Sequence, residues 1–283
     1  MKKNIFKSLV LFLAVTTFSS CLKDDRLVLD PEKGFNVIEF GNTSSIDVAG
    51  STVPLYINSF ALGKDAVLEI PINYAGPESG APEDITVTIS VLGTDAIDAY
   101  NDEQHDEVEL MTPNTYSLPS TTVVIPKGQR RGYLKVNVKP DLFDLTMKYG
   151  LPLKISSVSS GIISGNFGTA IYSIGAKNRL DGLYNYKTSA TTALKAGAND
   201  NNVPLTTSGP NTVTANLVNT YSNIVTYSVD PTTNKATVTN SGGIGAPITD
   251  PSSNYNPETK VLYVKWSAGA RQFEETYTYT GER

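Results

Sequence analysis

The chain has 283 residues, 40% of them hydrophobic, so it can bury a core, and its length favours two domains over one. Its formal net charge is −5, and removing the three lysines among the first twenty residues leaves 20 basic against 28 acidic residues, or −8. We therefore expect no nucleic-acid partner, because phosphates bind clustered Lys and Arg. One cysteine and one histidine exclude an internal disulfide and a histidine-rich zinc site. The same inventory disfavours a cysteine nucleophile.

The first twenty residues have the pattern of an export signal. Basic residues between Lys2 and Lys7 precede an apolar run, Leu9 to Val15, that is too short to span a bilayer. The following Phe18-Ser19-Ser20-Cys21 resembles a lipobox, in which the cysteine sulfur takes a diacylglycerol. We therefore expect residues 1–20 to be a lipoprotein signal peptide and Cys21 to be the lipidation site. A buried free cysteine is the alternative.

A charged triplet, Lys23, Asp24 and Asp25, follows the cysteine. It resembles the export signal of Bacteroidota lipoproteins, which directs them to the outer face of the cell. An ordinary charged linker is the alternative. We expect residues 21–35 to form an acylated cysteine and tether. The chain would then be lipid-anchored in the outer membrane, because an acylated cysteine is enough for stable anchoring. The charged triplet would make it face the exterior of the cell.

Short strands with alternating hydrophobicity fill residues 36–175. Gly and Pro interrupt them, and no amphipathic helix separates them, which favours an antiparallel sandwich. One helical turn is predicted over residues 95–101. The predicted strands are 66–74, 85–91, 122–125, 133–138, 151–155 and 169–174.

Four motifs in this first half carry a family resemblance. They are Ala99-Tyr100-Asn101, Tyr116-Ser117-Leu118-Pro119, Val124-Ile125-Pro126-Lys127-Gly128 and Tyr149-Gly150-Leu151-Pro152-Leu153-Lys154-Ile155. In this order they are similar to the Bacteroidota domain of unknown function numbered 1735, an immunoglobulin-like module of many surface lipoproteins. The module also precedes some endo-acting chitinase-like glycosidases. The resemblance implies an immunoglobulin-like fold for residues 36–175 and supplies no catalytic residues.

An acidic run surrounds His105. A cation site is one interpretation, because carboxylates supply the hard oxygen ligands that such ions prefer. The run lacks the ligand spacing and turn glycine of a calcium loop, so we favour a solvated loop and expect no metal and no cofactor. The acidic residues are Asp102, Glu103, Asp106, Glu107 and Glu109.

Residues 176–283 change in composition toward Thr, Asn, Ser, Gly and Tyr, which marks a second domain. Strands are predicted from residue 180, over 212–217, 223–229, 236–239, 261–266 and 271–279, and residues 195–210 are expected to form a polar loop. Turns are expected at Asp230-Pro231 and Asn256-Pro257, because Asx-Pro favours turn initiation. The up-and-down order predicts an antiparallel barrel or a second sandwich. The end of the chain resembles the lipocalin-like domains that follow this N-terminal family.

Catalysis is not expected, although an endoglycosidase-related enzyme is a remote alternative. No Asp-x-x-Asp-x-Asp-x-Glu motif occurs, and residues 176–283, which remain after the first domain, leave no room for a (β/α)8 barrel, which takes roughly 250 residues. Neither a nucleophile elbow nor a phosphate loop is present. We therefore predict a non-catalytic surface lipoprotein.

The expected role is an accessory glycan-binding protein of a polysaccharide-utilisation system. Its partners would be a polysaccharide or oligosaccharide and components of an outer-membrane importer. Tyr221 and Tyr255, each in a polar loop, and Trp266 are the candidate glycan-binding residues, although Trp266 shares a strand face with apolar residues. An adhesin or assembly lipoprotein that binds protein partners is the alternative.

Overall fold

The computed structural model describes residues 34–283. The predicted signal peptide, Cys21, Lys23, Asp24 and Asp25 lie outside the described residues and stay predictions. Within residues 34–283, no helix is long and apolar enough to cross a membrane.

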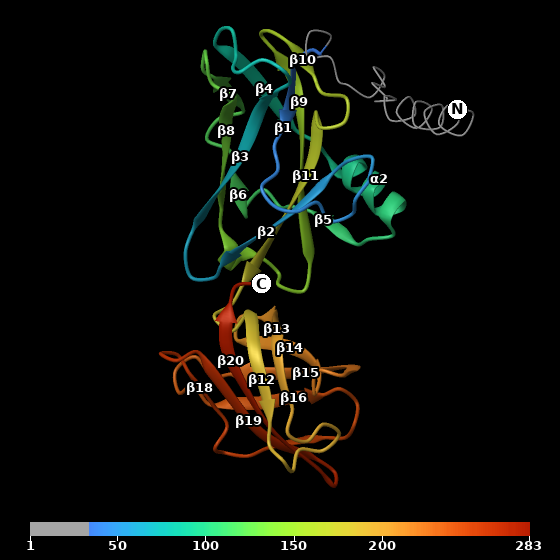
Figure 1. The fold of residues 1–283 in the computed structure, drawn as a ribbon, viewed down its shortest axis with the longest axis vertical. Helices are drawn as coiled ribbons and strands as arrows, with labels where there is room; N and C mark the ends of the chain where they lie inside the picture. Colours follow the sequence, from blue (N-terminus) through green and yellow to red (C-terminus); the bar gives the residue numbers. More distant parts are fainter. Residues whose placement is uncertain (1–33) are drawn as a thin grey trace, which may run out of the picture.

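The first half of the described chain is a sandwich of two sheets (Figure 1). One sheet has the order β10-β1-β3-β8-β6, and the other has the order β2-β11-β9-β4-β7, with β5 paired to β9. The strands are β1 (Val37–Phe40), β2 (Leu55–Ala61), β3 (Ala66–Ala75), β4 (Ile85–Val91), β5 (Val108–Leu110), β6 (Tyr116–Ser117), β7 (Thr122–Ile125), β8 (Arg131–Val138), β9 (Lys148–Val158), β10 (Ile162–Ile163) and β11 (Thr169–Lys177), with a 3-10 turn at Pro140–Leu142.

Strict alternation builds this sandwich. In β8 each second residue, from Gly132 to Val138, is buried while its neighbours are exposed. In β3 the predicted inward set of Leu68, Ile70, Ile72 and Tyr74 is buried in one core. Successive side chains of a strand point to opposite faces, so such a pattern leaves one face of each sheet in the core. The predicted all-β fold is confirmed.

The predicted helical turn is longer than expected. Helix α2 spans Thr94–Gln104 and buries Ile97 and Tyr100. It ends at His105, which adopts the left-handed conformation at φ 55° and donates its backbone N–H to the carbonyl of Asn101. The Asn101 side chain donates to and accepts from the backbone of Val108 at 2.8 and 2.9 Å. The Ala-Tyr-Asn motif is therefore structural, since it anchors the helix and the chain that follows it.

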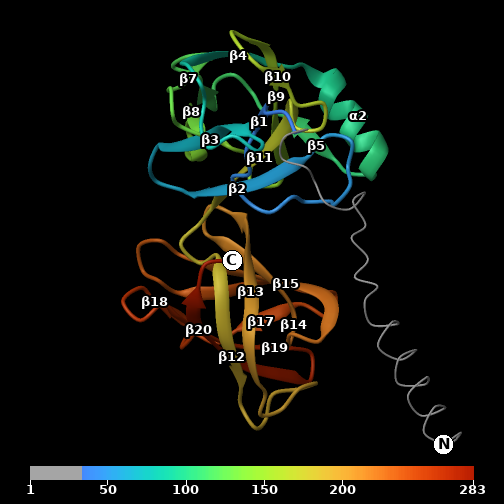
Figure 2. The ribbon, with the colours of Figure 1, turned by 45° about the horizontal axis from the view of Figure 1, so that its top comes forward.

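The second half is a meander that curls into a nearly closed barrel (Figures 1 and 2). Strands β12 to β16 follow one another in the sheet, β17 and β18 both pair with β19, and β20 pairs with β12 to join the two ends of the domain. Near the opposite seam, Val238 donates its N–H to Thr249 Oγ1 at 2.8 Å. The strands are β12 (Gly182–Thr188), β13 (Asn199–Gly209), β14 (Thr212–Leu217), β15 (Tyr221–Val229), β16 (Ala236–Ser241), β17 (Pro247–Thr249), β18 (Asn254–Asn256), β19 (Val261–Ala268) and β20 (Arg271–Gly281).

The prediction of a polar loop over residues 195–210 is wrong. Residues Asn199–Gly209 form β13, which lies between β12 and β14. Its Asn-rich start has low strand propensity, and only Val203 and Leu205 are buried. Two flanking strands supply pairing partners that outweigh this local preference.

Both Asx-Pro turns form where they were expected. The Asp230 carboxylate accepts the backbone N–H groups of Thr232 and Thr233 at 2.9 and 2.7 Å. The Asn256 side chain accepts from Glu258 and Thr259 in the same way. An Asx side chain that binds its own backbone two residues on fixes a tight turn.

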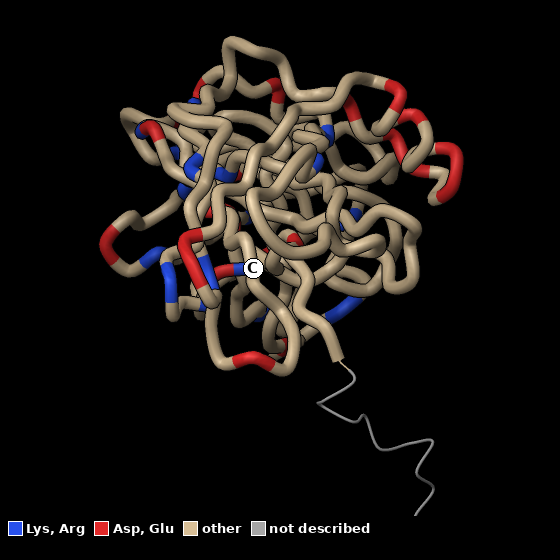
Figure 3. The backbone as a smooth tube through the Cα atoms, turned by 90° about the horizontal axis from the view of Figure 1, so that it is seen from above, with Lys and Arg blue, Asp and Glu red and all other residues tan. Residues whose placement is uncertain are grey.

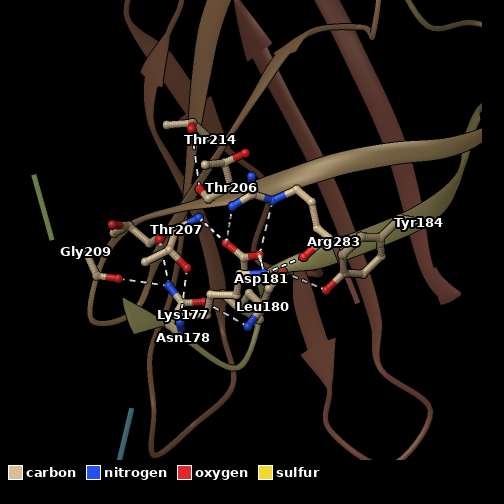
Figure 4. A network of polar contacts seen from close by, with 11 residues as sticks. Lys177, Asn178, Leu180, Asp181, Tyr184, Thr206, Thr207, Gly209, Thr214 and Arg283 are labelled. Carbon is tan, nitrogen blue, oxygen red and sulfur yellow. Dashed lines mark hydrogen bonds and ion pairs between the residues drawn. The ribbon is translucent and has the colours of Figure 1, made fainter. Parts of the chain in front are cut away.

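The two cores share no residue, and the chain crosses between them at residues 178–181. Figure 4 shows how this crossing is fixed to the barrel. The Asn178 amide donates to the carbonyls of Gly209 and Thr212, each at 2.8 Å. The buried Asp181 carboxylate accepts the Thr207 N–H at 2.7 Å and pairs with Arg283 at 3.1 Å. The connection is therefore part of the second domain rather than a free linker.

Candidate functional site

A groove of about 440 Å³ crosses the barrel wall on β19 and β20. We call it the β19–β20 groove. One rim is β17 with the two residues after it, and the other rim is the segment that follows β12. The lining residues are Ser189, Thr191, Thr192, Ile248, Thr249, Asp250, Pro251, Lys265, Trp266, Ser267, Gln272, Phe273 and Glu274.

Strand alternation gives this groove a polar floor. Trp266 and Phe273 are buried in the barrel core, so their neighbours Lys265, Ser267 and Gln272 lie on the outer face of the wall. The register places Ser267 opposite Gln272 and Lys265 opposite Glu274. Donors and acceptors therefore stand side by side across two strands.

The rim after β12 is tied to β20. Ser189 donates its N–H to the Glu274 carbonyl at 3.0 Å, and Ala193 donates to the Gln272 carbonyl at 2.7 Å. The Thr192 hydroxyl also donates to the Glu274 carbonyl, at 3.0 Å. This rim is thus pre-formed rather than a loose loop.

Several polar side chains of the groove have no protein partner. Within residues 34–283, no side-chain hydrogen bond engages Lys265, Ser267 or Gln272. By contrast, Glu274 accepts the hydroxyl of Tyr263 at 2.9 Å, and burial with this bond raises the pKa of Tyr263. Hydrogen bonds from Ser252 hold the pKa of Asp250 below its usual range. The groove can therefore offer an ammonium, an amide and a hydroxyl to a polar ligand, beside the carboxyl groups of Asp250 and Glu274.

A buried acid lies inside the barrel behind this groove. Glu275 is fully buried, and its carboxylate accepts the Tyr186 hydroxyl at 2.7 Å, the Tyr227 hydroxyl at 3.1 Å and the Trp266 indole N–H at 2.7 Å. The Tyr277 hydroxyl lies 3.0 Å from that of Tyr227. Burial raises the pKa of Glu275, and these donors oppose the rise.

Trp266 is not an exposed platform. It is 2% exposed, and its ring stacks on Phe273 with centroids 4.1 Å apart and 17° between the planes. A sugar has no open indole face to stack on in this structure. The expectation that Trp266 is a glycan-binding residue is corrected for that reason. The alternation of β19 places its side chain in the core.

Tyr255 is also buried, contrary to the expectation that its polar loop would expose it. The residue lies in the short strand β18, paired with Leu262, and is 4% exposed. The Arg179 guanidinium lies 5.2 Å from the centroid of its ring. Its neighbours Asn254 and Asn256 belong to the same strand and are exposed, because successive strand residues point to opposite faces.

Tyr221 is exposed, as predicted. It begins β15 and is 42% exposed, but it does not line the β19–β20 groove. The structure thus does not bring Tyr221, Tyr255 and Trp266 into one site. A glycan contact at Tyr221 stays a prediction.

The acidic run around His105 is engaged by the protein itself. The Glu103 carboxylate accepts the N–H and hydroxyl of Thr52 at 3.0 and 2.9 Å. The Lys148 ammonium pairs with Asp47 at 2.9 Å and with Asp106. Figure 3 shows acidic residues along α2. In the part of the chain that the structure describes, no group of three His, Cys, Asp or Glu side chains is placed to hold a metal ion.

The groove residues and Glu275 were not found from the sequence. The alternation Phe273-x-Glu275-x-Tyr277 in a predicted strand is the signal that could have found the buried acid, since it places a carboxylate on the apolar face. No comparable signal marks Gln272 or Ser267, because single polar residues on an outer strand face are common.

Two family models match the chain. Residues 40–162 match a model described only as a "-like, N-terminal domain", and residues 182–281 match a domain of unknown function, DUF7015. The two matches cover the sandwich and the barrel respectively. No curated protein matches the chain.

Solved structures from Bacteroides share the architecture. A protein of unknown function from Bacteroides ovatus has a TM-score of 0.51 at 15% identity, over 86% of this chain and 93% of that one. This likeness and the N-terminal family match confirm the predicted all-β, two-domain architecture.

Two further Bacteroides structures are similar at lower scores. A multidomain B. ovatus protein that includes DUF1735 has a TM-score of 0.46 at 14% identity, over 86% of this chain and 92% of that one. An auxiliary nutrient binding protein from Bacteroides thetaiotaomicron has a TM-score of 0.44 at 14% identity, over 78% of this chain and 89% of that one.

Proposed function

We propose that this protein is a non-catalytic, lipid-anchored surface protein that binds a neutral glycan in the β19–β20 groove. The single observation that carries the proposal is the row of side chains without protein partners, Lys265, Ser267 and Gln272, on the floor of a pre-formed groove. Sugar hydroxyls both donate and accept hydrogen bonds, so a wall that mixes an amide, a hydroxyl and an ammonium suits them.

The apolar part of the groove supports the same ligand class. Ile248, on the rim, is 70% exposed, and register places it beside Ser267 on the outer face. Pyranose rings carry an apolar face of C–H groups together with their hydroxyls. A polar floor with one exposed aliphatic rim residue therefore suits a sugar better than it suits an apolar ligand.

The test is affinity electrophoresis of the chain from residue 22, which keeps every described residue, in gels that contain neutral polysaccharides. Gln272→Ala and Ser267→Ala together should weaken retention by about thirtyfold, because each removes about 1 kcal/mol of hydrogen bonding. Asn240→Ala, an exposed change on β16, is the matched control. If no neutral polysaccharide retards the protein, or if the groove variants are retarded like the control, the protein-binding adhesin becomes the better proposal.

Localisation requires a separate experiment. Cys21→Ala should release the protein from the membrane fraction, because the thioether to diacylglycerol cannot form. Replacing Asp24 and Asp25 by Ala should keep the protein in the membrane but protect it from protease added to whole cells. If the double variant is cleaved on whole cells as fast as the parent, the surface-export part of the proposal is wrong.

A further inference from the structure

The outer face of the sandwich sheet that contains β3 and β8 carries the most exposed tyrosine of residues 34–283. Tyr133 is 51% exposed. Its position in β8 faces away from the core, because Leu134 and Gly132 on either side of it are buried. Register places Tyr133 opposite Pro71 of β3. The ring therefore stands on the outer surface of the sheet beside a second apolar group.

Cations flank this tyrosine on the same face. Arg131 and Lys135 are two residues away on either side, so each lies about 6.8 Å along the strand from Tyr133. Lys135 pairs with Glu69 at 3.4 Å, but both side chains are more than half exposed and such a pair contributes little. Within the described chain, Arg131 forms no salt bridge. Arg131 is thus the cation of this face that no carboxylate pairs with in residues 34–283, in a chain that is acidic overall.

A hollow of about 340 Å³ lies next to Arg131, in the range of small-ligand pockets. Its lining comes from the end of β3, Asn73 to Gly76, and from Arg130 and Arg131. Arg130 is held in place, since it donates to the carbonyl of Gly76 at 2.5 Å. That bond uses one of the five N–H donors of its guanidinium. Two arginines therefore line one small hollow.

The acids near the two arginines do not pair with them. Glu39 lies in the same row, but Asn73 of β3 separates it from Arg131. Glu78 accepts the hydroxyl of Tyr74. Neither forms a salt bridge with Arg130 or Arg131 within residues 34–283.

We propose that this face, at Arg131 and Tyr133, binds an acidic saccharide, a sugar that carries a carboxylate. The Arg131 guanidinium would take the carboxylate through two parallel N–H bonds, a geometry that arginine matches and lysine does not. The Tyr133 ring would contact the C–H face of the same or the next sugar, about 6.8 Å away. This inference rests on the proposed glycan-binding function, and it adds a second site on the other domain with a different ligand charge.

The test is calorimetric titration of the chain from residue 22 with tetragalacturonate and with its methyl ester, which keeps the sugar but removes the charge. We expect the acid to bind about tenfold or more tightly than the ester, because charge-assisted bonds are lost in the ester. Arg131→Ala and Tyr133→Ala should each weaken the binding of the acid about tenfold, and Arg131→Lys should restore only part of it. Lys187→Ala, which removes one exposed charge from the barrel, is the control and should change nothing.

Three results would overturn the proposal. Equal binding of the acid by Arg131→Ala and Lys187→Ala would show that general charge, not this site, attracts it. An unchanged affinity for the acid in Tyr133→Ala would show that the sugar ring does not contact the Tyr133 side chain. Binding of a sulfated oligosaccharide without binding of tetragalacturonate would overturn the carboxylate assignment. The groove variants Gln272→Ala and Ser267→Ala lie on the other domain and are tested with neutral polysaccharides. Failure of the groove proposal therefore shows in retention by neutral polysaccharides, whereas failure of the acidic-saccharide site shows in the binding of tetragalacturonate.

Discussion

The indole N–H of Trp266 donates to Oε2 of Glu275 at 2.7 Å, on the inner side of the wall whose outer side forms the β19–β20 groove. The only tryptophan of the chain thus reports on the barrel core and lies directly behind the candidate ligand site. Its fluorescence should follow unfolding of the barrel and should also respond to ligands in the groove.

Replacing the buried acid should destabilise the barrel. Glu275→Gln keeps the shape but presents an amide N–H₂ to hydroxyl and indole donors, so at least one buried donor loses its acceptor. We expect the free energy of unfolding to fall by about 1 to 3 kcal/mol, measured by urea titration of Trp266 fluorescence. Glu258→Gln, at an exposed turn, is the control and should stay within about 0.5 kcal/mol. A parent-like midpoint for Glu275→Gln would contradict the network described above.

The same residue should make stability depend on pH. Burial raises the pKa of Glu275 in the folded protein above that of the unfolded chain, so the folded state holds the proton more tightly. This contribution is complete below the unfolded pKa, about 4.3, and is lost as pH rises through the folded pKa. The difference in unfolding free energy between the parent and Glu275→Gln should therefore shrink as pH rises above about 4.3. A difference that grows over this range would reverse the assigned direction.

Two tyrosines that look alike in sequence should respond differently to truncation. Tyr255→Ala empties a buried position, so we expect a loss of about 3 to 5 kcal/mol in unfolding free energy. Tyr221→Ala changes an exposed side chain and should alter stability by less than about 0.5 kcal/mol. Thermal melts compare the two directly. Equal melting temperatures would mean that Tyr255 is not a core residue.

The crossing between the domains should depend on Asp181. Asp181→Asn keeps an acceptor for the Thr207 N–H but removes the charge that pairs with Arg283. We expect a loss of about 1 to 3 kcal/mol for the barrel, because the carboxylate is buried and hydrogen-bonded. Asp230→Asn, at an exposed turn, provides the comparison. The prediction fails if Asp181→Asn unfolds at the same urea concentration as Asp230→Asn.

Alternation made most of the sandwich predictable. In β3 and β8 every second residue is buried, and the sequence pattern carries that information without reference to the rest of the fold. Strand β13 was missed because only Val203 and Leu205 mark its inner face, and its pairing with β12 and β14 is a long-range effect. The hydrophobic pattern within a segment does not show which other strands will pair with that segment.

The site was harder to predict than the fold for a similar reason. Tyr255 was expected to be exposed because its neighbours are polar, but pairing with β19 turns it inward. The groove depends on which outer residues of β19, β20 and β17 become neighbours, and the barrel register decides this. Trp266 was rightly recognised as sharing a face with Leu262 and Val264, and that face is the core.

The lengthwise stacking of the two domains gives the molecule a polarity. In Figure 1, β1 and β10 lie at the end of the sandwich remote from the barrel, and the hairpin that joins β19 to β20 lies at the opposite tip. A chain attached through residues before β1 would hold the barrel outermost. The sandwich would then act as a spacer that lifts the groove clear of the surface, where long polymers can reach it from the side.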